Sequence, residues 1–236
     1  MKKLIYTCVT TIALALAGCF DIKDEIFLEE KGSGTFQTTM DMSGMKDMMD
    51  MLKTMMPDSL KDGKEMDESM NIEDSLMTMW KDLEKIPGIS QVKREKKGDM
   101  IVAISFRFAD IRALNAAMAS RDKKDSAAAV KPKEDMFSFS KSDFTCNSGS
   151  MAGLNDAMKG LNDAGSGSDS AAAGMAMLKA FMGDMKYTHI YHFPRKVQSV
   201  SNKNAKISED GKTVTLELDL ASGDSAQTLQ NSIRLR

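Results

Sequence analysis

The sequence lacks three features that would assign it to a well-marked class of protein. Its N-terminal apolar run, Leu4–Leu16, is too short and too interrupted by threonine to cross roughly 30 Å of hydrocarbon as a permanent helix. Lys and Arg (32) do not outnumber Asp and Glu (34), so there is no basic excess of the kind that binds nucleic acid. Gly-x-Ser-x-Gly, His-Glu-x-x-His and phosphate-loop motifs are missing. We therefore expect no nucleic-acid partner, no catalysis and no cofactor.

Cysteine is scarce as well, and the position of Cys19 stands out. Lys2 and Lys3 precede the apolar run, and Leu16-Ala17-Gly18-Cys19 ends it. A basic start, an apolar stretch and small residues at the end are typical of a signal peptide. The arrangement resembles the lipobox of bacterial lipoproteins, whose cysteine thiol receives a diacylglycerol. The resemblance implies that residues 1–18 are removed and that Cys19 is lipidated; the alternative is a secreted or signal-anchored protein with a cysteine there by chance.

The residues after Cys19 bear on location. Phe20 follows it instead of the aspartate that retains lipoproteins in the inner membrane, and Lys23-Asp24-Glu25 is similar to a Lys-acidic-acidic export signal. We predict attachment to the outer membrane through the acyl chains, facing the periplasm or the cell surface, with residues 19–25 as a tether. A merely solvated, charged tether is the alternative interpretation of this stretch.

The remaining cysteine has no partner in the mature chain. Cys8 leaves with the signal peptide and Cys19 is acylated, so Cys146 cannot form an intrachain disulfide. A single cysteine in a strand-like segment is far more often a small buried hydrophobic residue than a nucleophile.

Methionine is abundant, and twelve of the 22 lie between Met40 and Met79. Apolar residues recur at helical spacing over 45–56 and again over 70–85, and Pro57 separates the two segments. Unbranched methionine side chains can reshape around different ligands. We predict a groove for an apolar ligand or protein partner beneath these helices, lined by Met45, Met48, Met49, Leu52, Met55, Leu76, Met79 and Trp80. A closed core is the alternative.

The same methionines suggest a second function, because thioether sulfur is a ligand that selects Cu(I). The Met-x-Met and Met-x-x-Met spacings that could hold the ion involve Met40, Met42, Met45, Met48, Met49 and Met51. Several of these residues also occupy the apolar stripe of the expected helix, which favours packing over metal binding. Met42 and Met51 lie off that stripe and best distinguish the two interpretations.

Strand signals dominate the rest of the chain. They fall at 25–39, 89–96, 100–108, 136–146, 187–193, 197–207, 213–220 and 233–236, with a hairpin turn at 97–99 and Asp110 as the cap of a short helix. We predict an α+β fold, an antiparallel or mixed sheet of about seven strands with amphipathic helices packed on one face. Residues 26–236 form one domain with a Met-rich helical insertion at 44–86 and a Gly/Ala/Met-rich one at 147–184.

Tyr187, His189 and Tyr191 alternate onto one face of a strand and form a polar aromatic cluster, which is more often sheet packing than a site. The two histidines, His189 and His192, are three residues apart on this strand. They should point to opposite faces and cannot easily chelate one ion together.

Two stretches resemble the LppM-like lipoprotein domain. They are Ile101–Asn115, a strand running into a helix, and Phe193–Ser201 with its continuation to Leu216. The resemblance implies an α+β envelope domain with a cavity between sheet and helix of a kind that can hold lipid. The Met-rich segment and residues 147–184 depart from that pattern.

Overall fold

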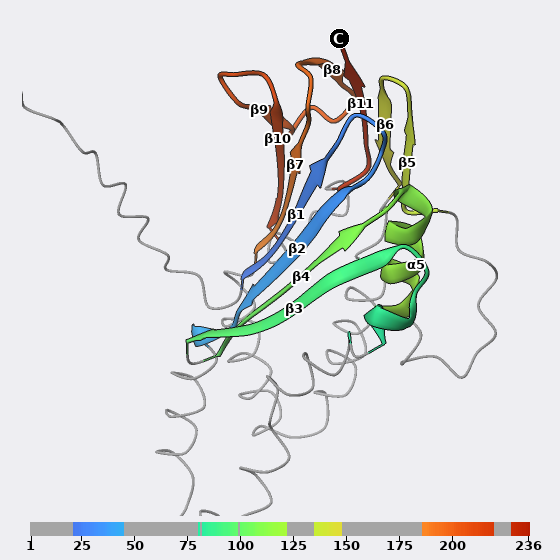
Figure 1. Cartoon of the computed structure of the whole chain (residues 1–236). Coiled ribbons are helices and arrows are strands. Elements are labelled where there is room, and N and C mark those ends of the chain that lie inside the picture. The colour runs from blue at the N-terminus through green and yellow to red at the C-terminus, as the bar shows by residue number, and fades with distance from the viewer. Residues whose placement is uncertain are drawn as a thin grey trace, which may run out of the picture.

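Two β-sheets and one α-helix make up the part of the chain described by the computed structural model, which is residues 21–44, 80, 82–98, 100–121, 135–147, 186–219 and 228–236 (Figure 1). The strands are β1 (Asp21–Leu28), β2 (Gly34–Asp41), β3 (Ile89–Gly98), β4 (Ile101–Phe108), β5 (Phe137–Ser140), β6 (Asp143–Cys146), β7 (Lys186–His192), β8 (Val197–Val200), β9 (Lys206–Ile207), β10 (Thr213–Asp219) and β11 (Asn231–Leu235). The helices are η1 (Leu83–Lys85), a 3-10 turn, and α5 (Ile111–Arg121). No helix in these ranges is long and apolar enough to span a membrane.

The large sheet has seven strands in the order β3-β4-β2-β1-β7-β10-β9, and it is mixed because β1 and β7 run parallel. The mixed sheet of seven strands is as predicted. A second sheet of four antiparallel strands, β5-β6-β11-β8, was not predicted. The predicted helical layer is also not supported, because α5 is the one α-helix in the described ranges; the helices expected at 45–56, 70–85 and 147–184 lie outside the described residues, apart from Trp80 and 82–85.

The core lies between the small sheet, α5 and one face of the large sheet, which we call the inner face. Even-numbered side chains of β1, β2 and β4 and the odd-numbered ones of β7 point there, as the alternating burial of each strand shows. From the small sheet, the Phe144 ring packs against Tyr191 with ring centroids 5.1 Å apart. From the other side, Trp80 packs against Phe36 and Phe106 at 5.9 and 6.0 Å. The two sheets therefore share one continuous aromatic core.

Two of the predicted single strands are hairpins, each closed by a short turn. Residues 25–39 are not one bent strand but the hairpin β1–β2, closed by a turn in which Glu29 N–H donates to the Ser33 carbonyl. Gly32 occupies the left-handed region there, at φ 81°. Residues 136–146 are likewise the hairpin β5–β6, and the turn resets the alternation so that Phe144 and Cys146 are buried. The predicted hairpin β3–β4 is confirmed.

Residues 197–207 also divide, into β8 in the small sheet and β9 in the large one. The buried side chain of Asn231 fixes the corner between them, because its Oδ1 accepts hydrogen bonds from the backbone N–H groups of Ser201 and Asn202. One amide oxygen thus satisfies two backbone donors where the chain changes sheet.

Helix α5 begins as predicted, with Asp110 Oδ1 accepting a hydrogen bond from the backbone N–H of Ala113. Asn115 then binds edge strand β5 through both ends of its amide. Its Nδ2 donates to the Phe137 carbonyl and its Oδ1 accepts from the Phe137 N–H. The side chain of Asn115 therefore satisfies backbone groups at one edge of the small sheet.

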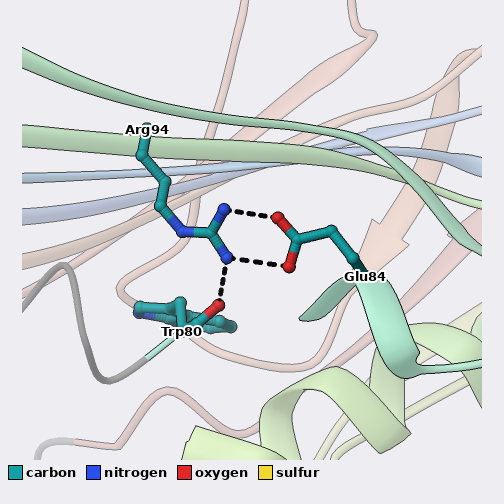
Figure 2. Close-up of polar contacts among 3 residues, drawn as sticks. All are labelled: Trp80, Glu84 and Arg94. Carbon is teal, nitrogen blue, oxygen red and sulfur yellow. Dashed lines mark hydrogen bonds and ion pairs between the residues drawn. The ribbon is translucent and has the colours of Figure 1, made fainter. Parts of the chain in front are cut away.

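Charged side chains cover β3, which is one of the two edge strands of the large sheet. Figure 2 shows Arg94, which donates to both carboxylate oxygens of Glu84, at 2.5 and 3.0 Å, and to the Trp80 carbonyl. The guanidinium group of Arg94 thus holds Trp80 and η1 against the edge of the sheet. Its hydrogen-bonded ion pair with Glu84 lowers the pKa of Glu84.

Candidate functional site

The described part of the chain begins at the end of the large sheet where β1 starts, just after the predicted lipid anchor in the sequence. β1 begins at Asp21, two residues after Cys19. Residues 21–25, which the sequence assigned to a tether, instead form the first half of a strand near the middle of the sheet. Cys19 itself lies outside the described residues. We call this end of the large sheet the anchored end.

Strand register places three further ends of described segments at or close to the anchored end. Asp21 pairs with Asp41 at the close of β2 and with Lys186 at the start of β7. Lys186 in turn pairs with Asp219, the last residue of β10. The described segment 21–44 thus ends close to this end of the sheet, and the segment 186–219 both begins and ends there.

An apolar row crosses the inner face next to the anchored end. Ile22 lies opposite Met40 on β2 and Tyr187 on β7, and Tyr187 lies opposite Leu218 on β10. Met40 and Leu218 are buried, while Ile22 and Tyr187 are partly exposed. This row is the described part of the inner face closest to Asp21, where β1 begins.

A buried chain of polar side chains lies one row further into the core. Asp24 on β1 is opposite His189 on β7, and both are buried. The Tyr187 hydroxyl donates to Asp24 Oδ2 at 2.6 Å, and His189 Nε2 lies 3.6 Å from the same oxygen. On its other side, His189 Nδ1 is hydrogen-bonded to the Tyr191 hydroxyl at 2.8 Å.

This environment keeps His189 charged at neutral pH. Burial by itself lowers the pKa of His189, but the Asp24 carboxylate, with a smaller contribution from the Cys146 thiol, raises it to about 9. Since an imidazolium carries a proton on both nitrogens, Nδ1 donates to the Tyr191 oxygen. Burial, followed by the neighbouring Cys146, raises the pKa of Tyr191 well above its usual value.

The arrangement is suited to holding an ion pair inside the core. Cys146 is free and fully buried, as predicted, and His189 and Asp24 are exposed by only 3% and 4%. A buried pair of this kind holds two strands in one register, because slippage would leave an unpaired charge in the core.

The predicted separation of the two histidines is confirmed. His189 lies in the core, whereas His192 lies on the opposite, outer face of the large sheet and stacks on Phe27. The sequence did not identify Asp24 as the partner of His189. The pairing joins residues on strands that are far apart in the chain, and no local pattern signals it.

Most of the predicted groove and metal residues cannot be placed. Met45, Met48, Met49, Met51, Leu52, Met55, Leu76 and Met79 lie outside the described residues. Trp80 is buried in the aromatic core. Met40 and Met42 are 6% and 1% exposed, which favours packing over metal binding for these two. Within the described ranges no group of three or more His, Cys, Asp or Glu residues could hold a metal ion.

A surface hollow of about 470 Å³ lies elsewhere, between the start of β3 and α5. It is lined by Ile86, Pro87, Gly88, Asp110, Arg112, Ala113 and Ala116. Arg112 and Asp110 at its rim are ion-paired with each other at 3.0 Å. The hollow shares no residue with the predicted groove.

Comparison with known proteins gives one distant likeness. No family model and no curated protein matches the chain. The NMR structure of the folded domain of LppM from Mycobacterium tuberculosis matches with a TM-score of 0.38 and 12% identity, over 93% of this chain and 90% of that one. This chain is thus distantly similar to the LppM domain. A TM-score of this size marks only a partial overlap of the chain paths.

Proposed function

We propose that this protein is a lipid-anchored component of the bacterial cell envelope that binds an apolar ligand or a protein partner without catalysing a reaction. The observation that carries the proposal is the start of β1 at Asp21, two residues after the cysteine of the lipobox. Acyl chains on Cys19 would be joined almost directly to a strand in the middle of the large sheet. The anchored end would then face the membrane surface at close range.

The chemistry of the anchored end supports binding at that place. The apolar row of Met40, Ile22, Tyr187 and Leu218 lies there, and two of its four side chains are partly exposed. The Met-rich residues 45–79 follow β2 within four residues. Apolar side chains of this kind accommodate acyl chains or an apolar segment of a partner.

Metabolic labelling tests the anchor. Cells grown with an alkyne analogue of palmitate should label the wild-type protein, which should float with membranes in a density gradient. Cys19→Ala should abolish both labelling and flotation. Cys146→Ala is the matched control and should keep both, because the thiol of Cys146 is buried in the core. Labelling that survives in Cys19→Ala would contradict the proposal.

Native mass spectrometry of the detergent-released protein tests the ligand. A bound lipid or peptide that adds a discrete mass is the expected result, and Ile22→Gln should reduce its occupancy by placing an amide in the apolar row. Ser90→Gln, an exposed change on β3, should leave occupancy unchanged. A wild-type spectrum without any adduct, or one carrying only Cu(I), would contradict apolar binding.

A further inference from the structure

An exposed aromatic ring stands on the outer face of the large sheet, away from the core and from the anchored end. Phe27 on β1 is 40% exposed, and Ile207 on β9 is the other large hydrophobic residue of the described chain that is exposed. Phe27 lies near the middle of the seven-stranded sheet, with β2 on one side and β7 on the other. A phenyl ring in water at such a position is available for contact with a partner.

The orientation of this ring is fixed by its neighbour. Phe27 stacks on His192 with ring centroids 4.1 Å apart and ring planes 4° from parallel. His192 is held from the strands on both sides of it, since its Nδ1 is 3.3 Å from Thr213 Oγ1 on β10 and its Nε2 is 3.6 Å from Glu25 Oε2 on β1. His192 therefore covers one side of the phenyl ring and fixes its orientation, so that a second stacking partner would contact the other side.

The charges around the ring are already paired with each other. Lys23 Nζ lies 2.6 Å from Glu25 Oε1, and Arg107 Nη2 donates to Glu29 Oε1 at 2.7 Å. A charged ligand would have to displace one of these partners. A neutral hydroxyl would not, because a carboxylate has further lone pairs and a guanidinium further N–H groups. Paired charges beside an aromatic ring thus favour a neutral polyhydroxyl ligand.

The register places a short side chain next to the ring. Thr35 lies directly between Phe27 and Arg107 in one row across the sheet, and its short side chain forms the floor between the two longer ones. From β4 to β1 this part of the row spans two inter-strand spacings, roughly 10 Å, which is enough for one sugar ring. Trp80 and the small sheet pack on the opposite, inner face.

We propose that this outer-face patch, formed by Lys23, Glu25, Phe27, Thr35, Arg107 and His192, binds a neutral oligosaccharide. One sugar ring lies over Thr35 with its C–H face against the open side of Phe27. Its hydroxyls are hydrogen-bonded by Arg107 and, toward the next ring, by Glu25 and Lys23. This binding is independent of the lipid anchor and of any ligand on the inner face.

Saturation-transfer NMR and calorimetry on the full-length protein in detergent micelles test the proposal. The probes are chitotetraose, cellotetraose and maltotetraose, with a sulfated heparin tetrasaccharide as the charged comparison. At least one neutral tetrasaccharide should bind with a millimolar or tighter dissociation constant, with little dependence on salt. Absence of binding by all three neutral probes, or binding of the sulfated probe alone, would overturn the proposal.

Substitution locates the site. Phe27→Ala should weaken the bound neutral sugar by about tenfold, the effect of losing one stacking contact, and Phe27→Trp should retain or strengthen it. Ile207→Ala removes the other exposed hydrophobic side chain and should leave affinity unchanged. Thermal unfolding of each variant checks that the fold is kept. Equal affinity of Phe27→Ala and the wild type would assign the sugar to another surface and overturn the proposal.

Discussion

At the scale of single residues, the buried pair of His189 and Asp24 makes stability depend on pH. The folded-state pKa of His189, about 9, lies above its ordinary value of 6.5. The pair therefore contributes fully below pH 6.5, and its contribution is lost as the pH rises toward 9. We expect the free energy of unfolding to fall over this window by up to about 3 kcal/mol from this group.

Urea unfolding at pH 6.5 and pH 9 measures that loss. The double variant Asp24→Asn/His189→Gln removes both charges without leaving one of them buried alone, so its stability should change much less between the two pH values. His189→Gln by itself should be the least stable protein at either pH, because it leaves the buried Asp24 carboxyl without its cationic partner. A double variant with the wild-type pH dependence would assign the effect to other groups.

Close backbone approach explains the glycine at position 34. A Cβ added to Gly34 would lie 2.0 Å from the Phe27 carbonyl oxygen and 2.7 Å from Phe108 Cζ. Gly34→Ala should therefore cost more than about 3 kcal/mol in unfolding free energy. Gly98→Ala is the matched control, since its Cβ would meet only Ile101 Cδ1 at 3.9 Å. Thermal melts compare the two; similar melting temperatures would contradict the predicted clash.

At the scale of elements, the β5–β6 hairpin contains a strained turn that can be improved. Ser140 pairs with Asp143, so the loop is Lys141-Ser142, and Lys141 has a φ of 52°. Asparagine tolerates this left-handed conformation better than lysine, so Lys141→Asn should stabilise the fold by about 0.5–1 kcal/mol. The Lys141 carbonyl still accepts from Arg195, since that bond uses the backbone. Differential scanning calorimetry should show a higher melting temperature for this variant but not for Lys203→Asn, an exposed site with ordinary backbone.

Local pattern was sufficient for some elements and not for others. The strict alternation of Val214, Leu216 and Leu218 predicted β10, and Asp110 predicted the start of α5, because both signals are contained in a few neighbouring residues. The hairpins β1–β2 and β5–β6 were each missed for a reason that is also local. A short turn shifts the alternation of buried and exposed residues, and in the sequence this shift resembles a bend or a change of face within one strand. Parallel pairing of β1 with β7 leaves no local signal at all.

The candidate site, too, could be predicted from local sequence patterns only in part. Tyr187, His189 and Tyr191 could be grouped from their alternation, and the opposite orientation of His192 followed from the same rule. The partner that raises the pKa of His189 is Asp24, which lies in the segment predicted to be a tether. Its role depends on the register between β1 and β7, and a sequence pattern cannot supply that register.

At the scale of the whole molecule, the direction of the strands determines which turns would lie near a membrane. Asp21 marks the anchored end, and Lys97 on β3 lies at the same end, since Gly98 pairs with Ile101 and Ile101 with Asp41. Lys212 precedes Thr213, which pairs with His192 at the opposite end of β7. Seven residues of β7 separate the two ends, roughly 23 Å.

Spin labels on these two exposed lysines test the proposed orientation. In liposomes that hold the acylated protein and a nickel-chelating lipid, a label at Lys97→Cys should relax faster than one at Lys212→Cys, because the nickel ions stay at the headgroups. A flexible Gly/Ser linker of about ten residues inserted after Phe20 should reduce the difference, since such a chain reaches roughly 17 Å and frees the domain to turn. Equal relaxation of the two labels without the linker would show that the anchored end does not face the membrane, even if Cys19 carries lipid.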